Sequence, residues 1–256
     1  MAELDIRQIA VLRDNYVYLA RDPETDACAA VDPAVAPPVL AMLQDLGWRL
    51  SHILCTHHHH DHVGGNLELK RATGCTIVGN RADADRIPGI DVMVSEGEEI
   101  TVGSQVARVF DVSGHTRGHI AYWFPGSRAA FVGDTLFALG CGRLFEGTPA
   151  EMWRSLCKLR DLPAETRIYC GHEYTESNAA FALTLDPDNE ALIARAERIR
   201  ALRREGRPTV PSVLAEEQAT NPFLRADEAA LQRAVGLVDA DPVATFAEIR
   251  RRKDSF

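Results

Sequence analysis

Short apolar runs alternate with turns through the first two thirds of the chain. The runs are QIAVLRDNYVYLA, ACAAVD, LSHILCT, CTIVGN, QVARVFDV, IAYWFP, AAFVGDTLF and TRIYCGH. They are rich in β-branched and aromatic residues and end at Gly, Pro or Asp, which predicts β-strands. Helical patterns lie between some of them, namely PPVLAMLQDLGW, the segment after Gly64 and TPAEMWRSLCKLRDL. This alternation predicts an α/β fold.

The last of these helical patterns carries its own start signal. Thr148 is expected at the N-cap and Pro149 at the first helical position, where its missing N–H costs nothing. Glu151 stands three residues after Thr148 and completes a capping box. We therefore expect a helix that begins at residue 149.

The pattern changes after about Tyr174, where the strand signals cease. SNAAFALTLD, NEALIARAERIRALRREG and DPVATFAEIRRRKD all have helical composition. The stretch RPTVPSVLAEEQATNPFL between them carries three prolines and is expected to be an ordered but irregular connection. We expect two domains, residues 1–174 and a smaller helical one over residues 175–256.

Composition excludes several classes of protein. With 46% apolar and 25% charged residues among 256, the chain has ordinary globular composition. Its apolar runs are broken well short of the ~20 residues that a membrane span needs, and its N-terminus lacks the apolar core of a signal peptide. The six cysteines form no C-x-x-C pair, which argues against a disulfide framework or a zinc ribbon. We expect a monomeric, cytoplasmic protein.

The net charge of the chain indicates which kinds of binding partner to expect. The formal charge of −9 disfavours nonspecific nucleic-acid binding, so neither a nucleic acid nor a membrane is expected as a partner. The last quarter is nevertheless locally basic, from ARAERIRALRREGR to IRRRKD. That local excess requires its own explanation.

Histidines are concentrated where predicted strands end. The stretch CTHHHHDHVGG contains five of them, SGHTRGH and YCGHEYT follow later strands, and FVGDT places an aspartate in the same way. Residues just past strand ends gather on one rim of an open α/β sheet, so these segments are expected to meet. In an extended segment, side chains two apart point the same way. His57, His59 and Asp61 are therefore expected to face one centre, and His58 and His60 to face away.

His62 has the wrong parity to join that set. The chain must therefore turn at Asp61 and His62 for both to reach the same centre. Gly64 and Gly65 follow directly and are expected to supply the conformational freedom for this turn.

Seven residues, five histidines and two aspartates, are candidate metal ligands, and one tetrahedral ion does not need so many. Two divalent ions fit better, with an anion between them to reduce their repulsion. We assign His57, His59 and His115 to one ion, Asp61, His62 and His172 to the other, and Asp134 to both as a bridge. A bridging hydroxide is then the expected nucleophile, which Asp61 also orients.

For other residues near these motifs, the sequence allows either a structural role or a role beside the metal ligands. Asp32 in AAVDPA either ends a strand before proline or accepts a hydrogen bond from a ligating histidine. Cys141 in LGCGR is expected to be a small buried residue, with a place behind the metal ligands as the alternative. The remaining histidines are expected to be exposed, packed or hydrogen-bonded rather than ligating: His52, His58, His60 and His119.

The pattern T-H-x-H-x-D-H, with its later G-H, G-D and G-H turns, resembles the metallo-β-lactamase superfamily. That resemblance implies an αββα sandwich with a dinuclear metal site. A closer resemblance, to the glyoxalase II family of hydroxyacylglutathione hydrolases, is carried by SGHTRGH, FVGDTLF, GCGRLFEGT, YCGHEYT, PTVPSVLAEE, NPFLR and the terminal RRRKD. It covers nearly the whole chain. It implies hydrolysis of S-(2-hydroxyacyl)glutathione thioesters, chiefly S-D-lactoylglutathione, the second step of methylglyoxal detoxification.

The resemblance also implies cofactors and substrate contacts. The cofactors would be two divalent ions per chain, zinc being expected and iron or manganese the alternatives. The glutathione contacts would be Arg143, Tyr174, Arg250 and Lys253. Arg250 and Lys253 are three apart in a helical pattern and so share a face, which would account for the basic C-terminus. Phe145 stands where some members have tyrosine, and it cannot donate a hydroxyl hydrogen bond.

Three other functions fit parts of the sequence. A glutathione-persulfide dioxygenase of the same superfamily would use a single iron, and the presence of Asp61, His62 and His172 disfavours it. A metallo-nuclease would share the dinuclear core, but the acidic charge and the lack of an aromatic and basic surface disfavour it. A noncatalytic metal-binding module is disfavoured because this ligand set leaves coordination positions open for water.

Overall fold

The computed structural model describes residues 2–256, which divide into two compact units. Unit one comprises residues 2–111 and 117–133, and unit two comprises residues 112–116 and 134–256. These units are defined by contacts within the structure and differ from the sequence domains 1–174 and 175–256, which stay a prediction.

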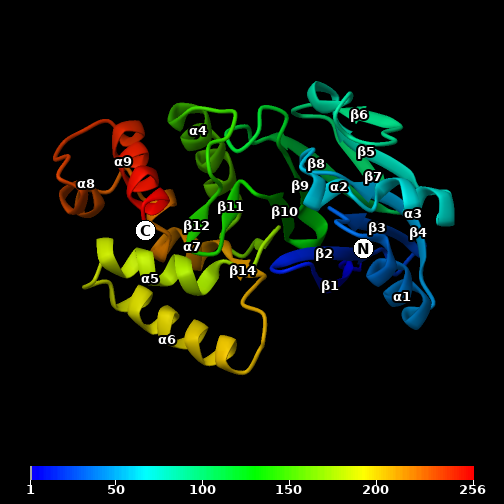
Figure 1. Cartoon of the computed structure of the whole chain (residues 1–256), viewed down its shortest axis with the longest axis horizontal. Helices are drawn as coiled ribbons and strands as arrows, with labels where there is room; N and C mark the ends of the chain where they lie inside the picture. The colour runs from blue at the N-terminus through cyan, green and yellow to red at the C-terminus, as the bar shows by residue number, and fades with distance from the viewer. Residues whose placement is uncertain (1) are drawn as a thin grey trace. The chain divides into compact units, whose positions relative to one another are not determined.

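Unit one contains a six-stranded sheet in the order β1-β2-β3-β4-β5-β6. The strands are β1 (Asp5–Val11), β2 (Asn15–Arg21), β3 (Ala27–Val31), β4 (Arg49–Leu54), β5 (Thr76–Asn80) and β6 (Val92–Val94). The first three are antiparallel, and β3 to β6 are parallel. Parallel neighbours need crossover connections, which here contain the helices α1 (Ala36–Leu46) and α3 (Asn66–Thr73) (Figure 1).

The run QIAVLRDNYVYLA, predicted as one strand, is a hairpin of β1 and β2. The chain reverses at Leu12, whose φ of 52° lies in the left-handed region that a branched side chain rarely adopts. Apolar patterning did not indicate this reversal because Leu12 continues the apolar run.

A second set of strands in unit one packs against this sheet. It consists of β7 (Glu99–Val102), β8 (Gln105–Asp111), β9 (Ile120–Phe124) and β10 (Ala129–Gly133), each antiparallel to the next. The ring of Tyr18 in β2 lies 5.6 Å from that of Phe131 in β10. The hydroxyl of buried Tyr122 donates a hydrogen bond to the carbonyl of Cys55, at 3.0 Å. The interior between the two sets of strands is therefore aromatic and fully buried.

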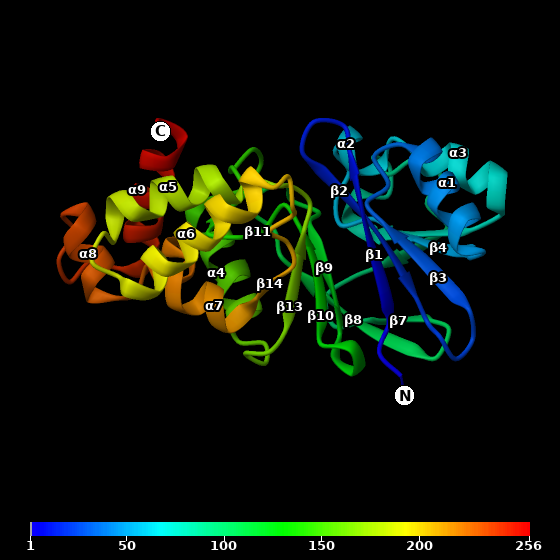
Figure 2. The same ribbon diagram turned by 90° about the horizontal axis from the view of Figure 1, so that it is seen from below.

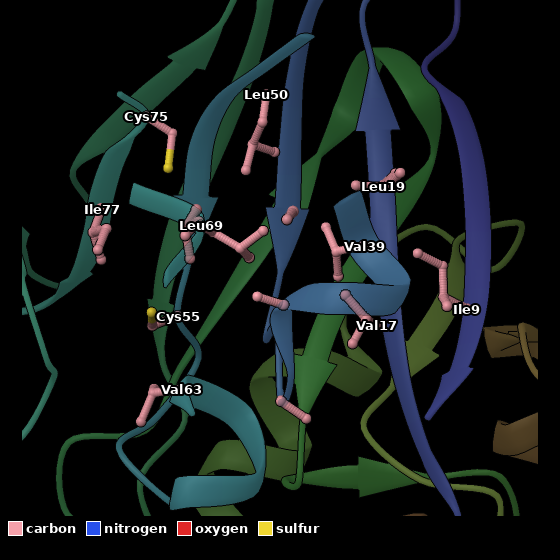
Figure 3. Close-up of a cluster of buried hydrophobic side chains, with 14 of the residues drawn as sticks. Ile9, Val17, Leu19, Val39, Leu50, Cys55, Val63, Leu69, Cys75 and Ile77 are labelled. Carbon is pink, nitrogen blue, oxygen red and sulfur yellow. The ribbon is translucent and has the colours of Figure 1, made fainter. Parts of the chain in front are cut away.

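The helices α1 and α3 cover the other face of the six-stranded sheet (Figure 2). Val39 of α1 and Leu69 of α3 are completely buried against strand residues such as Val17 and Ile77 (Figure 3). Burial of each such side chain contributes about 1.5–3 kcal/mol to folding. The order helix, sheet, sheet within unit one accounts for three layers of the predicted αββα sandwich.

Unit two is mainly helical. Its elements are β11 (Leu136–Phe137), β12 (Gly140–Cys141), α4 (Pro149–Arg160), β13 (Arg167–Cys170), α5 (Thr175–Leu185), α6 (Glu190–Arg204), β14 (Ser212–Val213), α7 (Leu214–Thr220), η3 (Pro222–Leu224), α8 (Ala229–Val235) and α9 (Pro242–Asp254). Helices α5 and α6 run side by side (Figure 2) over a small apolar cluster that includes Leu139 and Leu192. Within residues 2–256, no helix is long and apolar enough to cross a membrane.

The predicted start of α4 is confirmed. Thr148 accepts a hydrogen bond from the N–H of Glu151, whose carboxylate accepts one from the N–H of Thr148, and Pro149 is the first helical residue. The expectation of an irregular connection over residues 207–224 was wrong in part, because this stretch contains β14, α7 and η3. These elements, and the unpredicted α8, are too short to show a clear period.

Buried amides hold the hairpin formed by β11 and β12. Asn178 of α5 donates from Nδ2 to the carbonyl of Ala138, at 3.0 Å. Asn221 donates from its Nδ2 to the carbonyls of Phe137 and Gly140, both at 3.1 Å. Both amide side chains are almost inaccessible to solvent. Side chains from the helical segments therefore satisfy the carbonyl groups of the hairpin.

A buried ion pair completes this arrangement. Glu217 of α7 is fully buried and accepts a hydrogen bond from the N–H of Leu139, at 2.9 Å. Its other oxygen pairs with Arg195 of α6, which also donates to Thr220 at 2.7 Å. The neighbouring Glu216 bonds the same arginine but is partly exposed.

All six cysteines are free, and five of them are buried while Cys157 is half-buried. Burial raises the pKa of every one of these thiols, to about 12 for Cys28 and about 11 for Cys141. They are therefore protonated thiols at neutral pH.

The two adjacent glutamates of α7 provide a matched test. Glu217→Ala should lower the free energy of unfolding by about 3–5 kcal/mol, because it removes the buried partner of Arg195, leaving only the partly exposed Glu216, and takes the acceptor from the N–H of Leu139. Glu216→Ala should cost less than about 1 kcal/mol, because exposed ion pairs contribute little. Urea unfolding of both variants measures the difference. Equal losses would show that Arg195 does not depend on the buried partner.

Candidate functional site

Four of the predicted ligands lie on one segment of unit one, between β4 and α3. His57 and His62 are fully buried. His57 Nε2 lies 3.1 Å from His59 Nδ1, and His62 Nε2 lies 3.7 Å from Asp61 Oδ2. The short helix α2 (His60–Val63) makes the turn that brings the last pair into place. Imidazole nitrogens and a carboxylate at these separations suit a first-row divalent metal.

Asp32 orients this segment. Its Oδ1 accepts a hydrogen bond from the N–H of Thr56, and its Oδ2 accepts one from the Thr56 hydroxyl, both at 2.7 Å. Its Oδ2 also lies 3.1 Å from His62 Nδ1, and the Thr56 hydroxyl lies 3.0 Å from His57 Nδ1. With Nδ1 engaged in each ring, Nε2 is the nitrogen left to bind a metal.

Asp32 therefore has both roles that the sequence allowed: it ends a strand before proline, and it contacts a predicted ligand. Its φ of 50° ends β3 before Pro33, and its carboxylate contacts a predicted ligand. Its ligand atoms also lie within 4.8 Å of those of His57 and His62. Because Thr56 and His62 occupy its oxygens, Asp32 orients ligands and is not itself assigned as one.

Asn15, at the start of β2, was not indicated by the sequence patterns. It is almost fully buried, and its Nδ2 donates to the carbonyl of Asp61 at 3.1 Å and to Asp61 Oδ2 at 3.0 Å. It therefore fixes the rotamer of a predicted ligand. The two residues are 46 positions apart, and no local pattern connects them.

The predicted role of Gly64 and Gly65 was wrong. Their φ values of −61° and −84° are open to any residue. A Cβ on Gly64 would lie 2.6 Å from the carbonyl oxygen of Ala34, and one on Gly65 would lie 2.7 Å from that of Pro33. The glycines are required because two backbones approach closely, and they do not supply a special backbone angle.

The other three predicted ligands come together in unit two. His115, Asp134 and His172 are each about 95% buried. Both histidines direct Nε2 at Asp134 Oδ2, at 3.5 Å from His115 and 3.3 Å from His172. His115 Nδ1 donates to the carbonyl of Arg143, at 2.8 Å, so its Nε2 is available as a ligand. This is a second set of donors that suits a divalent metal.

Two exposed aromatic rings adjoin these histidines. Tyr174 is stacked on His172 with ring centroids 4.8 Å apart and planes 4° from parallel. Phe145 lies edge-on to His115 at 5.2 Å and is 62% exposed. The side chain of Arg143 is also exposed. Three of the positions predicted or questioned as substrate contacts are therefore accessible from solvent beside metal-ligating groups.

Arg250 and Lys253 of α9 lie in different surroundings. Arg250 is buried, donates to the carbonyl of Cys141 at 2.9 Å and pairs with Asp254 at 2.8 Å. Lys253 is half-buried and donates to the hydroxyl of Ser177 at 3.1 Å. Burial lowers the pKa of Lys253 to about 8, and the positive charges of Arg250 and Arg143 add to this effect. That Arg250 and Lys253 bind glutathione stays a prediction.

The other four histidines and Cys141 are packed, hydrogen-bonded or exposed. His119 is buried and stacked on His57, with ring centroids 4.6 Å apart. His60 is exposed, and His58 is bonded to Asp83. His52 is half-buried, with Nδ1 at 2.9 Å from the Ser51 hydroxyl. The Cys141 sulfur lies 3.8 Å from Arg250 Nη1 and has no contact with a predicted ligand among those described.

Two models of known protein families match consecutive parts of the chain. The model of the metallo-β-lactamase superfamily matches residues 11–172, and that of the hydroxyacylglutathione hydrolase C-terminus matches residues 173–256. The hydroxyacylglutathione hydrolase of Methylococcus capsulatus is 62% identical over 99% of both chains.

Two solved structures are also similar. ETHE1 from Myxococcus xanthus superposes with a TM-score of 0.68 at 27% identity, over 98% of this chain and 99% of that one. TTHA1623, solved in a di-iron-bound form, gives a TM-score of 0.56 at 29% identity, over 65% of this chain and 90% of that one. The matches in sequence cover the histidine motifs and the C-terminal helices alike. The chain therefore belongs to the hydroxyacylglutathione hydrolase family of the metallo-β-lactamase superfamily.

Proposed function

We propose that the chain hydrolyses S-(2-hydroxyacyl)glutathione thioesters, chiefly S-D-lactoylglutathione, to glutathione and a 2-hydroxy acid such as D-lactate. The observation that carries this proposal is the 62% identity, over nearly the full length, to a hydroxyacylglutathione hydrolase. The reaction completes methylglyoxal detoxification, for which we propose the cytoplasm as the compartment and a monomer as the active form.

We propose that the seven ligands act together on two divalent ions, zinc being expected and iron or manganese the alternatives. His57, His59 and His115 would hold one ion, Asp61, His62 and His172 the other, and Asp134 both. Support comes from the donor sets, in which neighbouring groups engage Nδ1 of His57, His62 and His115, and from a relative in di-iron-bound form. When bound, such ions lower the pKa of water and polarise a carbonyl.

Residues of the chain itself would orient the attacking water and supply negative charge at the site. Asn15 holds Asp61 Oδ2, so that this carboxylate can orient the attacking water with its remaining lone pairs. Asp134 supplies negative charge at the centre of the site. The leaving group is a thiolate, and a thiol of ordinary pKa departs without a dedicated general acid.

The glutathione part would lie against unit two. We propose that Arg143, Tyr174, Arg250 and Lys253 contact it, which assigns residues 175–256 to substrate binding. Lys253 would present its half-buried ammonium group, which lies beside the Ser177 hydroxyl, to the glycine carboxylate. Phe145 offers only its ring, so the contact there is apolar. Arg250 also supports the hairpin at Cys141, and its replacement would disturb both roles.

The metal stoichiometry follows from the ligand count. Active protein should contain about two first-row ions per chain. Asp134→Ala should lower both metal content and kcat/KM, the latter by more than the roughly 10- to 100-fold typical of losing an outer partner of a ligand. Elemental analysis and a lactoylglutathione assay on the same samples measure this. Fully active protein with one ion or fewer would exclude the dinuclear proposal.

Selectivity tests the substrate class. Lactoylglutathione should be cleaved with a higher kcat/KM than a β-lactam or a phosphodiester, because the helical C-terminal region belongs to the hydrolase family. All three should be compared on one metal-loaded preparation. A phosphodiester turned over best would make the thioester assignment wrong.

The lowered pKa of Lys253 predicts a pH dependence. Lys253 is protonated below about 8 and should then hold the substrate carboxylate. As the pH rises through about 8 the charge is lost, so kcat/KM should fall by roughly 10- to 150-fold, the value of a charge-assisted hydrogen bond. Profiles of kcat/KM against pH, which report groups of the free enzyme, measure this fall.

Two variants isolate the contribution of Lys253 to that profile. Lys253→Met should lower kcat/KM below pH 8 and remove the alkaline fall. Arg251→Ala changes an exposed residue that pairs with Glu248 and should leave the profile unaltered. An alkaline fall that survives in Lys253→Met would assign it to another group.

A further inference from the structure

A buried carboxylate outside the proposed metal ligands binds the histidine run from its other side. Asp83 closes the short helix η1 (Arg81–Asp83), and its side chain is completely inaccessible to solvent. Its Oδ2 lies 2.9 Å from Nδ1 of His58, the residue between two predicted ligands. Its Oδ1 accepts a hydrogen bond from Nε of Arg86, at 3.2 Å, and pairs with Nη2 of the same side chain.

These three side chains form a closed ring of hydrogen bonds. Arg86 Nη1 lies 3.2 Å from His58 Nε2. All three contacts are satisfied at once when His58 donates from Nδ1 to Asp83 and accepts at Nε2 from Arg86. The ring therefore fixes both the orientation and the tautomer of His58.

The backbone at Gly118 packs closely on Asp83. A Cβ placed on Gly118 would lie 2.2 Å from its carboxylate, so the backbone there packs directly on it. The carbonyl of Gly118 accepts a hydrogen bond from Asn80, at 3.0 Å. Asp83 is thus a buried and closely packed residue to which the histidine run is hydrogen-bonded through His58.

We propose that Asp83 is a positioning residue that acts through His58 to hold His57 and His59 in their metal-binding orientation. The ring of His58 lies edge-on to that of His59, with centroids 4.9 Å apart, and His58 is bonded through the backbone to both ligands, so fixing His58 restricts its two neighbours. The inference rests on the proposed function only in taking His57 and His59 as ligands. Asp83 itself is not among the proposed metal ligands or substrate contacts.

The test measures metal retention by competition with a chromophoric chelator, using zinc. Asp83→Ala should weaken zinc binding by about 10- to 100-fold, the usual effect of losing a partner behind a metal ligand. His58→Leu should do the same. It leaves the pair of Asp83 and Arg86 intact, so it carries the test if Asp83→Ala does not fold. Asp83→Asn keeps one acceptor for His58 and should fall between Asp83→Ala and the wild type.

Asp22 provides a matched control. It is as buried as Asp83, and its carboxylate accepts hydrogen bonds from the N–H groups of Glu24 and Ser104 and from the Thr25 hydroxyl, none of them in the histidine run. Asp22→Ala should lower the free energy of unfolding and leave zinc affinity within about twofold of the wild type.

A second readout uses the metal-free protein. Nitrogen NMR of the imidazole groups should show His58 protonated at Nδ1 in the wild type, with this signature lost in Asp83→Ala. Folded Asp83→Ala and His58→Leu proteins that bind zinc as tightly as the wild type would overturn the proposal. A wild type that binds no divalent ion would instead overturn the proposed function, and the NMR measurement would still decide whether Asp83 fixes His58.

Discussion

The histidine run depends first on the buried carboxylate of Asp32. A carboxylate withdrawn from water is costly unless donors surround it, and here Thr56 supplies two and His62 lies within reach of a third contact. Charge-assisted hydrogen bonds are short and directional, so this one group fixes both ends of the run. The nitrogens of the predicted ligands on this run are thereby oriented by hydrogen bonds within the protein itself.

In unit two, buried polar side chains likewise fix a segment of the chain through hydrogen bonds. The hairpin that follows Asp134 has few backbone partners of its own, so Asn178, Asn221 and Glu217 bind its carbonyl and N–H groups. These side chains come from helices late in the chain. The C-terminal region is therefore a structural support for the hairpin next to Asp134, a predicted ligand, as well as the proposed binding surface for glutathione.

Much of the fold was predictable because local signals were strong. The capping box at Thr148 and the β-branched runs were correctly interpreted. The reversal at Leu12 was not, since a leucine with positive φ leaves no mark in an apolar pattern. The glycines after His62 were recognised as important for the wrong reason. Contacts such as those of Asn15 and Asp83 depend on partners far along the chain, which spacing alone does not connect.

The burial of the cysteines has a consequence for an enzyme that is proposed to release glutathione at every turnover. Mixed disulfides form through a thiolate, and all six thiols of this chain are held protonated by raised pKa values. At neutral pH these thiols therefore present oxidised glutathione with a smaller thiolate fraction than an ordinary cysteine would, which disfavours glutathionylation of the chain.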